Sequence, residues 1–405
     1  MQKSGGAAIP MQLSFKELQY IVGSPETIVQ MKEARGLRPF DDEVISFLND
    51  LSSVLRKNRE YPDVATFGFW CRKAALLQEK TKYDDINERV GKGIVFHSTP
   101  SNVPVNFAFS FAAGLLAGNA NIVRLPGKPF EQVDIISKAV KELLTTTHQN
   151  MAPYIVFVKF PPVREITDTF STLCNVRVIW GGDLTVAELR QSKIMARTTE
   201  ITFADRHSIA VIDADEYLKA ERKDTIIQNF YNDTYYTDQN ACTSPRIIFW
   251  KGKQKEEAKV DFWNRLHELV KNKYSITAIQ AVGKLNAMYT VAVNKKVSLE
   301  DSEDMLITRL NVDEIDKDLM NYKYNSGFYF EKDIENLSEI INVCDIRCQT
   351  LTYYGVEKIE FEAFLENSRP IGIDRIVPMG KSMDFALIWD GYDLIRQMSR
   401  RITVI

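Results

Sequence analysis

One long stretch of the sequence, Gly93–Val123, contains no Asp, Glu, Lys or Arg and reads GIVFHSTPSNVPVNFAFSFAAGLLAGNANIV. In a chain of 405 residues of which 26% are charged, such a stretch belongs either in a protein core or in a membrane. Its length would suffice for a bilayer, which takes about 20 apolar residues. Prolines, asparagines and glycines interrupt it, however, and unsatisfied polar groups are costly in hydrocarbon. The composition therefore favours the interior of a globular domain.

The charge-free stretch divides into strand, loop, helix and strand. Residues 93–97 are a β-branched and aromatic run, which is typical of a buried parallel strand. Residues 105–117 carry apolar side chains at four-residue steps, with alanines between them that allow close packing, and therefore predict a buried helix. The run 121–125 returns as a second strand. The sequence thus predicts a βαβ unit with both faces of its sheet covered.

The alternation of strands and helices continues downstream of this unit. The pattern predicts strands at 154–160 and 176–180 and helices at 163–173 and 184–191. Gly181 and Gly182 fall at the turn between the second of these strands and the helix that follows it. Doubly wound folds bind nucleotides at such turns, because glycine lets the backbone approach a ligand. The alternative is a plain turn, for which glycine is the default residue.

A chain of this length exceeds the roughly 250–300 residues at which a single core stops growing, so we expect two α/β domains. The first, 1–207, combines a mostly helical lead that acts as a packing layer with the domain built on the charge-free stretch. The second, 208–370, repeats the alternation, and 371–405 is a C-terminal return segment with a possible oligomerisation strand at 401–405. The first predicted elements of the second domain are a strand at 208–212, a helix at 217–231 and a strand at 246–250.

Charge and cysteine content exclude several classes of protein. The net charge of −3 gives no global field that would gather a nucleic acid. Five scattered cysteines cannot form a dense disulfide framework, and with no secretory signal at the N-terminus they indicate a cytoplasmic protein. We expect no metal site, since the four histidines have no shared ligand spacing. Cys344 and Cys348 are interpreted as small buried residues.

The most informative chemistry surrounds Cys242. Asp238-Gln-Asn-Ala precedes this cysteine and Thr-Ser-Pro follows it, just before a predicted strand. A loop of hydrogen-bonding side chains and free amides can position and activate a thiolate. The alternative is that Cys242 is another small buried residue, as free cysteines commonly are.

Three blocks of the sequence resemble the aldehyde dehydrogenase superfamily, and specifically its LuxC-type acyl-CoA reductase branch. Ser101–Pro104 with Ala112–Asn119 is similar to the superfamily's Trp-Asn-x-Pro loop and its small-residue helix. Asp238–Pro245 resembles the nucleophile segment of the branch, and Gly372–Gly380 with Trp389–Tyr392 resembles a C-terminal block particular to it. The resemblance implies an aldehyde dehydrogenase-like fold with two doubly wound α/β domains, one binding the cofactor and one catalytic.

The resemblance also implies two catalytic residues. Cys242 would be the nucleophile, and Asn102 would be the side-chain donor of the oxyanion hole. A thiolate that attacks a thioester carbonyl generates negative charge on the carbonyl oxygen, which a fixed amide donor stabilises. The alternative for Asn102 is a loop-capping side chain between two prolines.

Four residues are implied in cofactor binding. Arg124 would lie near the ribose of the adenosine and could grip a 2′-phosphate, which favours NADPH over NADH. Gly181 and Gly182 would form the turn beneath the pyrophosphate, and Gln349 would reach a ribose. The alternatives are a surface arginine for Arg124 and an ordinary strand residue for Gln349.

One departure from the superfamily pattern bears on the reaction. Phe203 occupies the position at which oxidising members carry the glutamate that activates water. Without a positioned base, hydrolysis of an acyl-enzyme should be slow, as a reductase requires. Asp205 and His207 lie close by in the sequence and are alternative bases.

Together these features predict NADPH-dependent reduction of a fatty acyl thioester, either acyl-CoA or acyl-protein, to the aldehyde through an acyl-Cys242 intermediate. Two alternatives stay open: a cysteine-dependent thioester hydrolase or acyltransferase on the same fold, and an inactive nucleotide-binding scaffold of an acyl-transfer complex. The resemblance further implies a homo-oligomer. An acyl-transferring protein is a possible partner.

Overall fold

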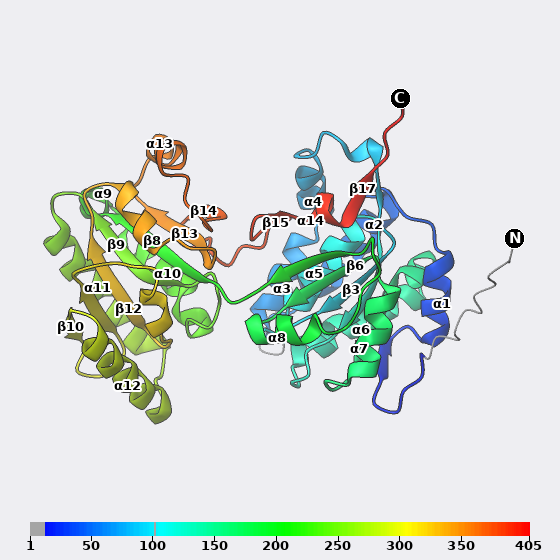
Figure 1. Ribbon diagram of the computed structural model, residues 1–405, viewed down its shortest axis with the longest axis horizontal. Coiled ribbons are helices and arrows are strands. Elements are labelled where there is room, and N and C mark those ends of the chain that lie inside the picture. Colours follow the sequence, from blue (N-terminus) through cyan, green and yellow to red (C-terminus); the bar gives the residue numbers. More distant parts are fainter. Residues whose placement is uncertain (1–12, 101–102) are drawn as a thin grey trace, which may run out of the picture. The chain divides into compact units, whose positions relative to one another are not determined.

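The structure, a computed structural model, describes residues 13–100 and 103–405 (Figure 1). Two units divide the chain: unit 1 comprises the chain as far as Ala204 together with Leu387–Ile405, and unit 2 comprises Asp205–Ala386. The segment 371–405, taken above as one piece, is split between them. Its first half adds a strand to the sheet of unit 2, whereas its second half pairs with a strand of unit 1.

Unit 1 is built on a six-stranded sheet in the order β1-β5-β4-β3-β6-β7. The strands β5, β4, β3, β6 and β7 are parallel, and β1 is antiparallel at the edge. Among the parallel strands the chain begins with β3, moves outward through β4 and β5, and then returns to the other side of β3, which is the doubly wound topology. The strands are β1 Gln19–Val22, β3 Ile94–Ser98, β4 Ala120–Arg124, β5 Ile155–Lys159, β6 Val176–Trp180 and β7 Thr199–Phe203.

Helices pack on this sheet and form the lead before it. The lead is helical as predicted, except that it also contributes the edge strand β1. The helices of unit 1 are α1 Pro25–Glu33, α2 Asp42–Leu55, α3 Pro62–Trp70, α4 Lys73–Lys80, α5 Asn106–Leu116, α6 Glu131–Thr145, α7 Arg164–Leu173, α8 Asp183–Leu189 and α14 Leu394–Met398, with 3-10 turns η1 Ile86–Glu88 and η2 Gln149–Tyr154.

The charge-free stretch forms β3, α5 and β4, as the sequence predicts. Every side chain of β3 is buried, and all residues of α5 except Asn106 and Phe109 are buried as well. Gly114 lets α5 approach β4 closely, because a Cβ at this position would lie 1.9 Å from Oδ1 of Asn121. Burial on both sides explains why the stretch carries no charge.

Unit 2 is built on a seven-stranded sheet in the order β10-β11-β12-β9-β8-β13-β14, parallel except for the edge strand β10. Alternate residues of β8 face two separate cores: Ile209 and Val211 belong to one, and Ala210 and Ile212 to the other. The strands are β8 His207–Asp213, β9 Pro245–Lys251, β10 Val297–Asp301, β11 Thr308–Val312, β12 Phe328–Asp333, β13 Cys348–Tyr354 and β14 Arg375–Pro378. The helices are α9 Ala214–Lys219, α10 Lys223–Asp233, α11 Lys255–Lys273, α12 Ala278–Asn294 and α13 Lys358–Ser368, with 3-10 turns η3 Tyr235–Thr237, η4 Leu319–Tyr322 and η5 Leu337–Val343.

Two further sequence-based predictions differ from the structure. The helix expected at 217–231 is broken into α9 and α10, because the chain turns at 220–222 after α9. The strand expected at 401–405 is instead β17 Ser399–Arg401, which pairs with β2 Arg89–Gly91 of the same chain. The remaining short strands are β15 Ile388–Trp389 and β16 Tyr392–Asp393, which pair with each other. Within residues 13–100 and 103–405, no helix has both the length and the apolar character needed to cross a bilayer.

Candidate functional site

The switch point of the unit 1 sheet lies between β3 and β6, from which the chain winds in opposite directions. β6 ends at Trp180, and Gly181 and Gly182 connect it to α8. Gly182 has ordinary backbone angles, φ −64° and ψ 168°, and a Cβ built on it would meet no atom within 4 Å. A Cβ on Gly181, in contrast, would lie 2.9 Å from Cγ2 of Thr185. The backbone at Gly182 is therefore open to a close approach by a ligand, which is what a dinucleotide pyrophosphate requires.

Arg124 is the last residue of β4, at the same carboxyl edge of the sheet. Its guanidinium carbon lies 4.6 Å from the centre of the Phe160 ring, and Nη2 donates to the Phe160 carbonyl over 3.2 Å. Burial lowers the pKa of Arg124, and the charge of Glu188 on α8 opposes that effect. An oriented cation and an open glycine turn at one sheet edge fit the phosphates of a dinucleotide.

A buried polar network lies beneath this edge. The ring of His97 contacts the Ser110 hydroxyl through Nδ1 at 2.7 Å and Oδ1 of Asn121 through Nε2 at 2.9 Å, and the Trp180 indole donates to the same hydroxyl. Burial lowers the pKa of His97 to about 4, so the ring is neutral at pH 7. The network fixes the end of β6 before Gly181. Sequence reasoning missed it, because its members are spread over four elements.

Cys242 lies in unit 2, on the loop between η3 and β9, and is half-buried. Two consecutive residues of this loop, Asp238 and Gln239, have positive φ angles of 51° and 52°. Left-handed backbone at two non-glycine residues costs energy and persists only where surrounding contacts hold it. The buried side chain of Gln239 supplies such contacts: its Oε1 accepts from the amides of Gly327 and Phe328, and its Nε2 donates to the carbonyls of Pro245 and Phe328.

Arg246, four residues after Cys242, is buried beneath the loop. It donates to the carbonyls of Gln239 and Tyr324 and, over 2.7 Å, to Oδ1 of Asn325. Burial lowers the pKa of Arg246 to about 10, while electrostatic interactions with neighbouring groups, among them Asp205, Asp238 and Cys242, act in the opposite direction. A buried cation therefore lies close enough to Cys242 to interact with it electrostatically. The sequence holds a signal for this arginine in its position close after the cysteine, but not for its burial.

The Cys242 backbone is tied to the sheet by Ser208. The Ser208 hydroxyl donates to the Cys242 carbonyl over 2.8 Å and accepts from the Thr350 amide at 3.2 Å. Ser208 is in β8 and Thr350 is in β13, so a chain of hydrogen bonds runs from two adjacent strands to the cysteine. It fixes the backbone of the residue that carries the thiol.

A C-terminal segment reaches the residue next to Cys242. The Thr243 hydroxyl donates to Sδ of Met383 over 3.1 Å. The segment that carries Met383 is held by the buried carboxylate of Asp233, which accepts from the Gly380 amide at 2.6 Å and from the amide and hydroxyl of Ser382. Burial raises the pKa of Asp233 to about 6. This segment directly continues the C-terminal block singled out in the sequence.

Comparison with known proteins identifies the family. The model of the acyl-CoA reductase (LuxC) family matches residues 71–401. The chain belongs to this family. Its fold is that of the aldehyde dehydrogenases: lactaldehyde dehydrogenase from Escherichia coli is 12% identical, with a TM-score of 0.64 and coverage of 94% of this chain and 88% of that one. An oxidoreductase from Marinobacter aquaeolei is 13% identical, with a TM-score of 0.65 and coverages of 94% and 91%.

A structure described as an E. coli NADP dependent enzyme is 12% identical, with a TM-score of 0.61 and coverages of 92% and 88%. No curated protein matches the chain significantly. Together with the doubly wound sheets, these comparisons make the protein an acyl-CoA reductase family member with an aldehyde dehydrogenase-like fold and suggest a nicotinamide cofactor.

The other predicted site residues lie as follows. Asn102 falls outside the described residues. Gln349 is buried in β13, and its carbonyl accepts from the Asp374 amide. Phe203 is in β7 of unit 1, with its ring stacked on Trp180 at 3.7 Å, and offers no base. Each of these three assignments stays a prediction.

The two alternative bases have different surroundings. Both carboxylate oxygens of Asp205 accept from Lys323 at 3.0 Å, so this side chain is engaged in an ion pair. His207 is buried, burial lowers its pKa to about 4, and its Nε2 has no hydrogen-bond partner among the described residues. At these two positions the chain therefore has a neutral imidazole and a carboxylate that is paired with Lys323.

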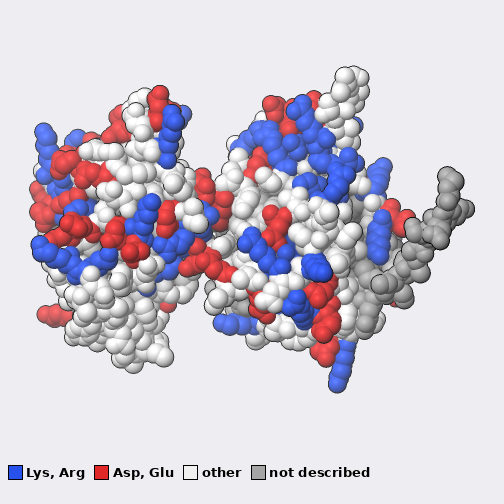
Figure 2. All heavy atoms as spheres, viewed as in Figure 1, with Lys and Arg blue, Asp and Glu red and all other residues white. Residues whose placement is uncertain are grey.

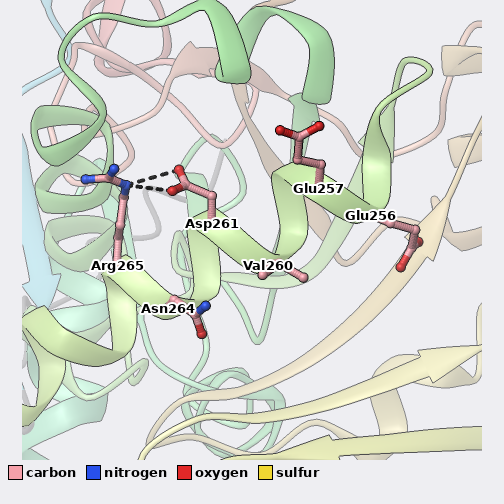
Figure 3. A pocket seen from close by; sticks show the side chains of 6 residues that line it. All are labelled: Glu256, Glu257, Val260, Asp261, Asn264 and Arg265. Atoms are coloured by element: carbon pink, nitrogen blue, oxygen red, sulfur yellow. Dashed lines mark hydrogen bonds and ion pairs between the residues drawn. The ribbon is translucent and has the colours of Figure 1, made fainter.

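Unit 2 also has a surface hollow of about 530 Å³, lined by six residues of α11 (Figure 3). Within it, Arg265 donates through Nε to both carboxylate oxygens of Asp261 at 3.0 Å. The lining comes from a single helix, is rich in acidic side chains and includes none of the predicted site residues. A polyanionic cofactor or coenzyme A would be repelled there, so we do not place the reaction in this hollow.

Proposed function

We propose that the protein reduces a fatty acyl thioester to the aldehyde with NADPH, through a covalent acyl group on Cys242. The observation that carries the proposal is the setting of this cysteine: a half-buried thiol on a strained loop, with the buried Arg246 cation beneath it. The other four cysteines of the chain are buried. For Cys71, for example, burial raises the thiol pKa well above its usual value. Cys242 is therefore the thiol best suited to attack a carbonyl carbon.

The reaction begins when the Cys242 thiolate attacks the carbonyl carbon of the acyl thioester. A carbon–sulfur bond forms to Cys242, the bond to the coenzyme or carrier sulfur breaks, and that sulfur leaves as a thiolate. Asn102 and the Cys242 amide would donate to the carbonyl oxygen as charge develops on it. Ser208 holds the Cys242 carbonyl, which keeps this backbone in place while the bond forms.

The nicotinamide cofactor, when bound, supplies a hydride to the acyl carbon. Gly181, Gly182 and Arg124 would hold its phosphates at the carboxyl edge of the unit 1 sheet. Asn102 would again stabilise the oxyanion, which collapses to the aldehyde and releases the Cys242 thiolate. The two electrons of the hydride form the new carbon–hydrogen bond, and the electron pair of the broken carbon–sulfur bond stays on the Cys242 sulfur. No proton is required. Water must be kept from the acyl-enzyme, and Phe203 in place of a base is consistent with that need.

The test incubates the protein with a long-chain acyl-CoA, with and without NADPH, and follows NADPH absorbance and the intact mass. Without NADPH we expect one acyl adduct per chain; NADPH then removes the adduct and yields one aldehyde for each NADPH consumed. Cys242→Ala should form no adduct, whereas the control Cys71→Ala should acylate normally because its thiol is buried.

Each other outcome contradicts the reductase. Fatty acid released without NADPH would favour a thioester hydrolase, for which the neutral imidazole of His207 offers a base. A protein that forms no adduct would favour the scaffold. A Cys242→Ala variant that still consumes NADPH on acyl-CoA would exclude Cys242 as the nucleophile.

A further inference from the structure

The buried carboxylate of Asp233 anchors the chain at residues 380–382. It accepts from the Gly380 amide at 2.6 Å and from the amide and hydroxyl of Ser382 at 3.1 Å and 2.8 Å. Asp233 is the last residue of α10, where the helix dipole opposes a negative charge, and burial adds to that cost. Three hydrogen bonds to one carboxylate offset this cost, so they specify the position of 380–382 strongly.

A second charged side chain holds the chain around Met383. Arg375 in β14 donates to the Ser382 carbonyl over 3.2 Å and to the Asp384 carbonyl over 3.0 Å. The residues directly before and after Met383 are therefore each bound by a guanidinium. A methionine side chain is flexible and adapts to its surroundings, so a fixed backbone restricts where its sulfur can lie.

The thioether of Met383 lies beside the loop that carries Cys242. Its Sδ accepts from the hydroxyl of Thr243, which is buried and directly follows Cys242, yet Met383 is 39% exposed. Unit 2 carries many charges of both signs on the face that Figure 2 shows, and Lys381 and Asp384 of this segment form an exposed ion pair at 2.9 Å. Met383 instead offers apolar surface to a group bound to the neighbouring thiol.

We propose that Met383 is a specificity-determining residue, whose thioether packs on the first carbons of the acyl group carried by Cys242. Asp233 and Arg375 are then positioning residues, which act on the acyl group only through Met383. Methionine suits this role because it is unbranched and polarisable, so it fits apolar chains of different shape. That the bound group is an acyl chain rests on the proposed function; the apolar surface beside the thiol does not.

The experiment measures how fast Cys242 reacts with alkyl methanethiosulfonates, by intact mass. These reagents form a disulfide between the cysteine sulfur and an S-alkyl group and release methanesulfinate, so they probe the surroundings of the thiol without acyl transfer. The readout is the ratio of the octyl rate to the methyl rate. Both rates are measured on the same protein, so the ratio does not depend on the fraction that is folded. Cys242→Ser should not react, because the other cysteines are buried.

We expect Met383→Ala to lower this ratio about tenfold, since the octyl chain loses its contact with an apolar side chain. Met383→Leu should retain most of the ratio, because leucine is apolar and of similar volume. The matched control is Ile359→Ala, which removes an exposed apolar side chain elsewhere in unit 2, at the start of α13, and should leave the ratio unchanged.

Asp233→Asn tests the positioning role. Its amide keeps one acceptor oxygen but turns an N–H toward backbone donors, so the anchor weakens. We expect the ratio to fall as in Met383→Ala, with no further fall in the double variant, because both changes act through one contact. Ser382→Ala removes only the hydroxyl bond to Asp233 and should lower the ratio less. A merely structural role would lower the unfolding midpoint and leave the ratio intact.

The proposal and the proposed function fail in different ways. The ratio of acylation rates with octanoyl-CoA and acetyl-CoA should fall in parallel with the thiosulfonate ratio. A wild type that forms no acyl adduct would contradict the proposed function, whereas the thiosulfonate ratio would still decide the role of Met383. A thiosulfonate ratio that is unchanged in Met383→Ala, or that falls equally in Ile359→Ala, would overturn the proposal. An unchanged ratio in Asp233→Asn would overturn the positioning role of Asp233.

Discussion

Both units are built on a mostly parallel sheet, with different strand orders, and they carry their candidate residues at opposite edges of these sheets. In unit 1, Arg124 ends β4 and Gly181 follows β6, so both lie at the carboxyl edge where doubly wound sheets bind ligands. In unit 2, Cys242 precedes β9 and therefore lies at the amino edge. At the carboxyl edge of unit 2, Lys251 pairs with Asp213 and with Glu360. Topology alone thus predicts where a cofactor binds in unit 1, but not where the nucleophile lies in unit 2.

The difference has a physical basis in the loops. A glycine turn needs only open backbone, which a strand-to-helix connection provides. A nucleophilic thiol needs a cation and a fixed backbone, and in unit 2 these come from Gln239, Arg246 and Ser208 around the loop before β9. Breaking each arrangement separately should therefore produce different kinds of defect in the two units.

The largest effect is expected from Arg246→Met, which removes the cation beneath Cys242 and keeps a side chain of similar length. At pH 7 the variant should alkylate Cys242 with iodoacetamide, and transfer acyl groups, about 100-fold more slowly, equivalent to about 2.7 kcal/mol. The control is Arg309→Met, which also breaks contacts of a partly buried arginine in unit 2, with Glu331 and Glu300. Equal losses in the two variants would mean general destabilisation rather than activation of the thiol.

The second prediction compares the buried histidines of the two units. For each, burial lowers the pKa from its ordinary value to about 4 in the folded protein. As the pH falls below about 6.5, each histidine binds a proton in the unfolded chain but stays neutral in the folded chain. The stability that depends on the neutral histidine is therefore present above this pH and is lost as the pH falls toward 4. Each histidine should contribute about 2 kcal/mol of the loss in unfolding free energy between pH 7 and pH 5.

The two histidines differ in their hydrogen-bond partners, so substitution of each should change the stability of the protein differently. His207→Leu should change stability little at pH 7 and reduce the acid-induced loss, because its Nε2 has no hydrogen-bond partner in the described part of the chain. His97→Leu should also cost about 2 kcal/mol at pH 7, because Asn121 and Ser110 lose their partner. The measurement is denaturant unfolding at the two pH values. Identical pH profiles for wild type and His207→Leu would contradict the assignment.

The smallest effect is expected from Gly182→Val in unit 1. The new side chain enters open space on an ordinary backbone, so the unfolding free energy should change by less than about 0.5 kcal/mol. If a pyrophosphate approaches this turn, the Kd for NADPH should still rise about tenfold, or about 1.4 kcal/mol. Gly127→Val is the matched control, because a Cβ there also meets nothing within 4 Å. Equal NADPH binding by the two variants would remove Gly182 from the cofactor site.

The sequence alone determined the elements whose pattern is local. The charge-free stretch predicts β3, α5 and β4 because hydrophobic period and the absence of charge are properties of neighbouring residues. The three blocks that carry the family resemblance, Ser101–Pro104 with Ala112–Asn119, the Cys242 segment and the C-terminal block, are also made of short local motifs. Together they indicated the acyl-CoA reductase family, which the family comparison confirms.

Only the tertiary structure decided which distant groups meet. Arg246 bonds to Tyr324, and Met383 reaches Thr243, across separations of 78 and 140 residues that no local pattern encodes. The orientation of α12 is the clearest case, because its pattern alone would place Lys284 outward and Val282 and Val293 inward. The fold does the reverse: three backbone carbonyls converge on one point and bind the ammonium there, while Val282 and Val293 lie on the surface.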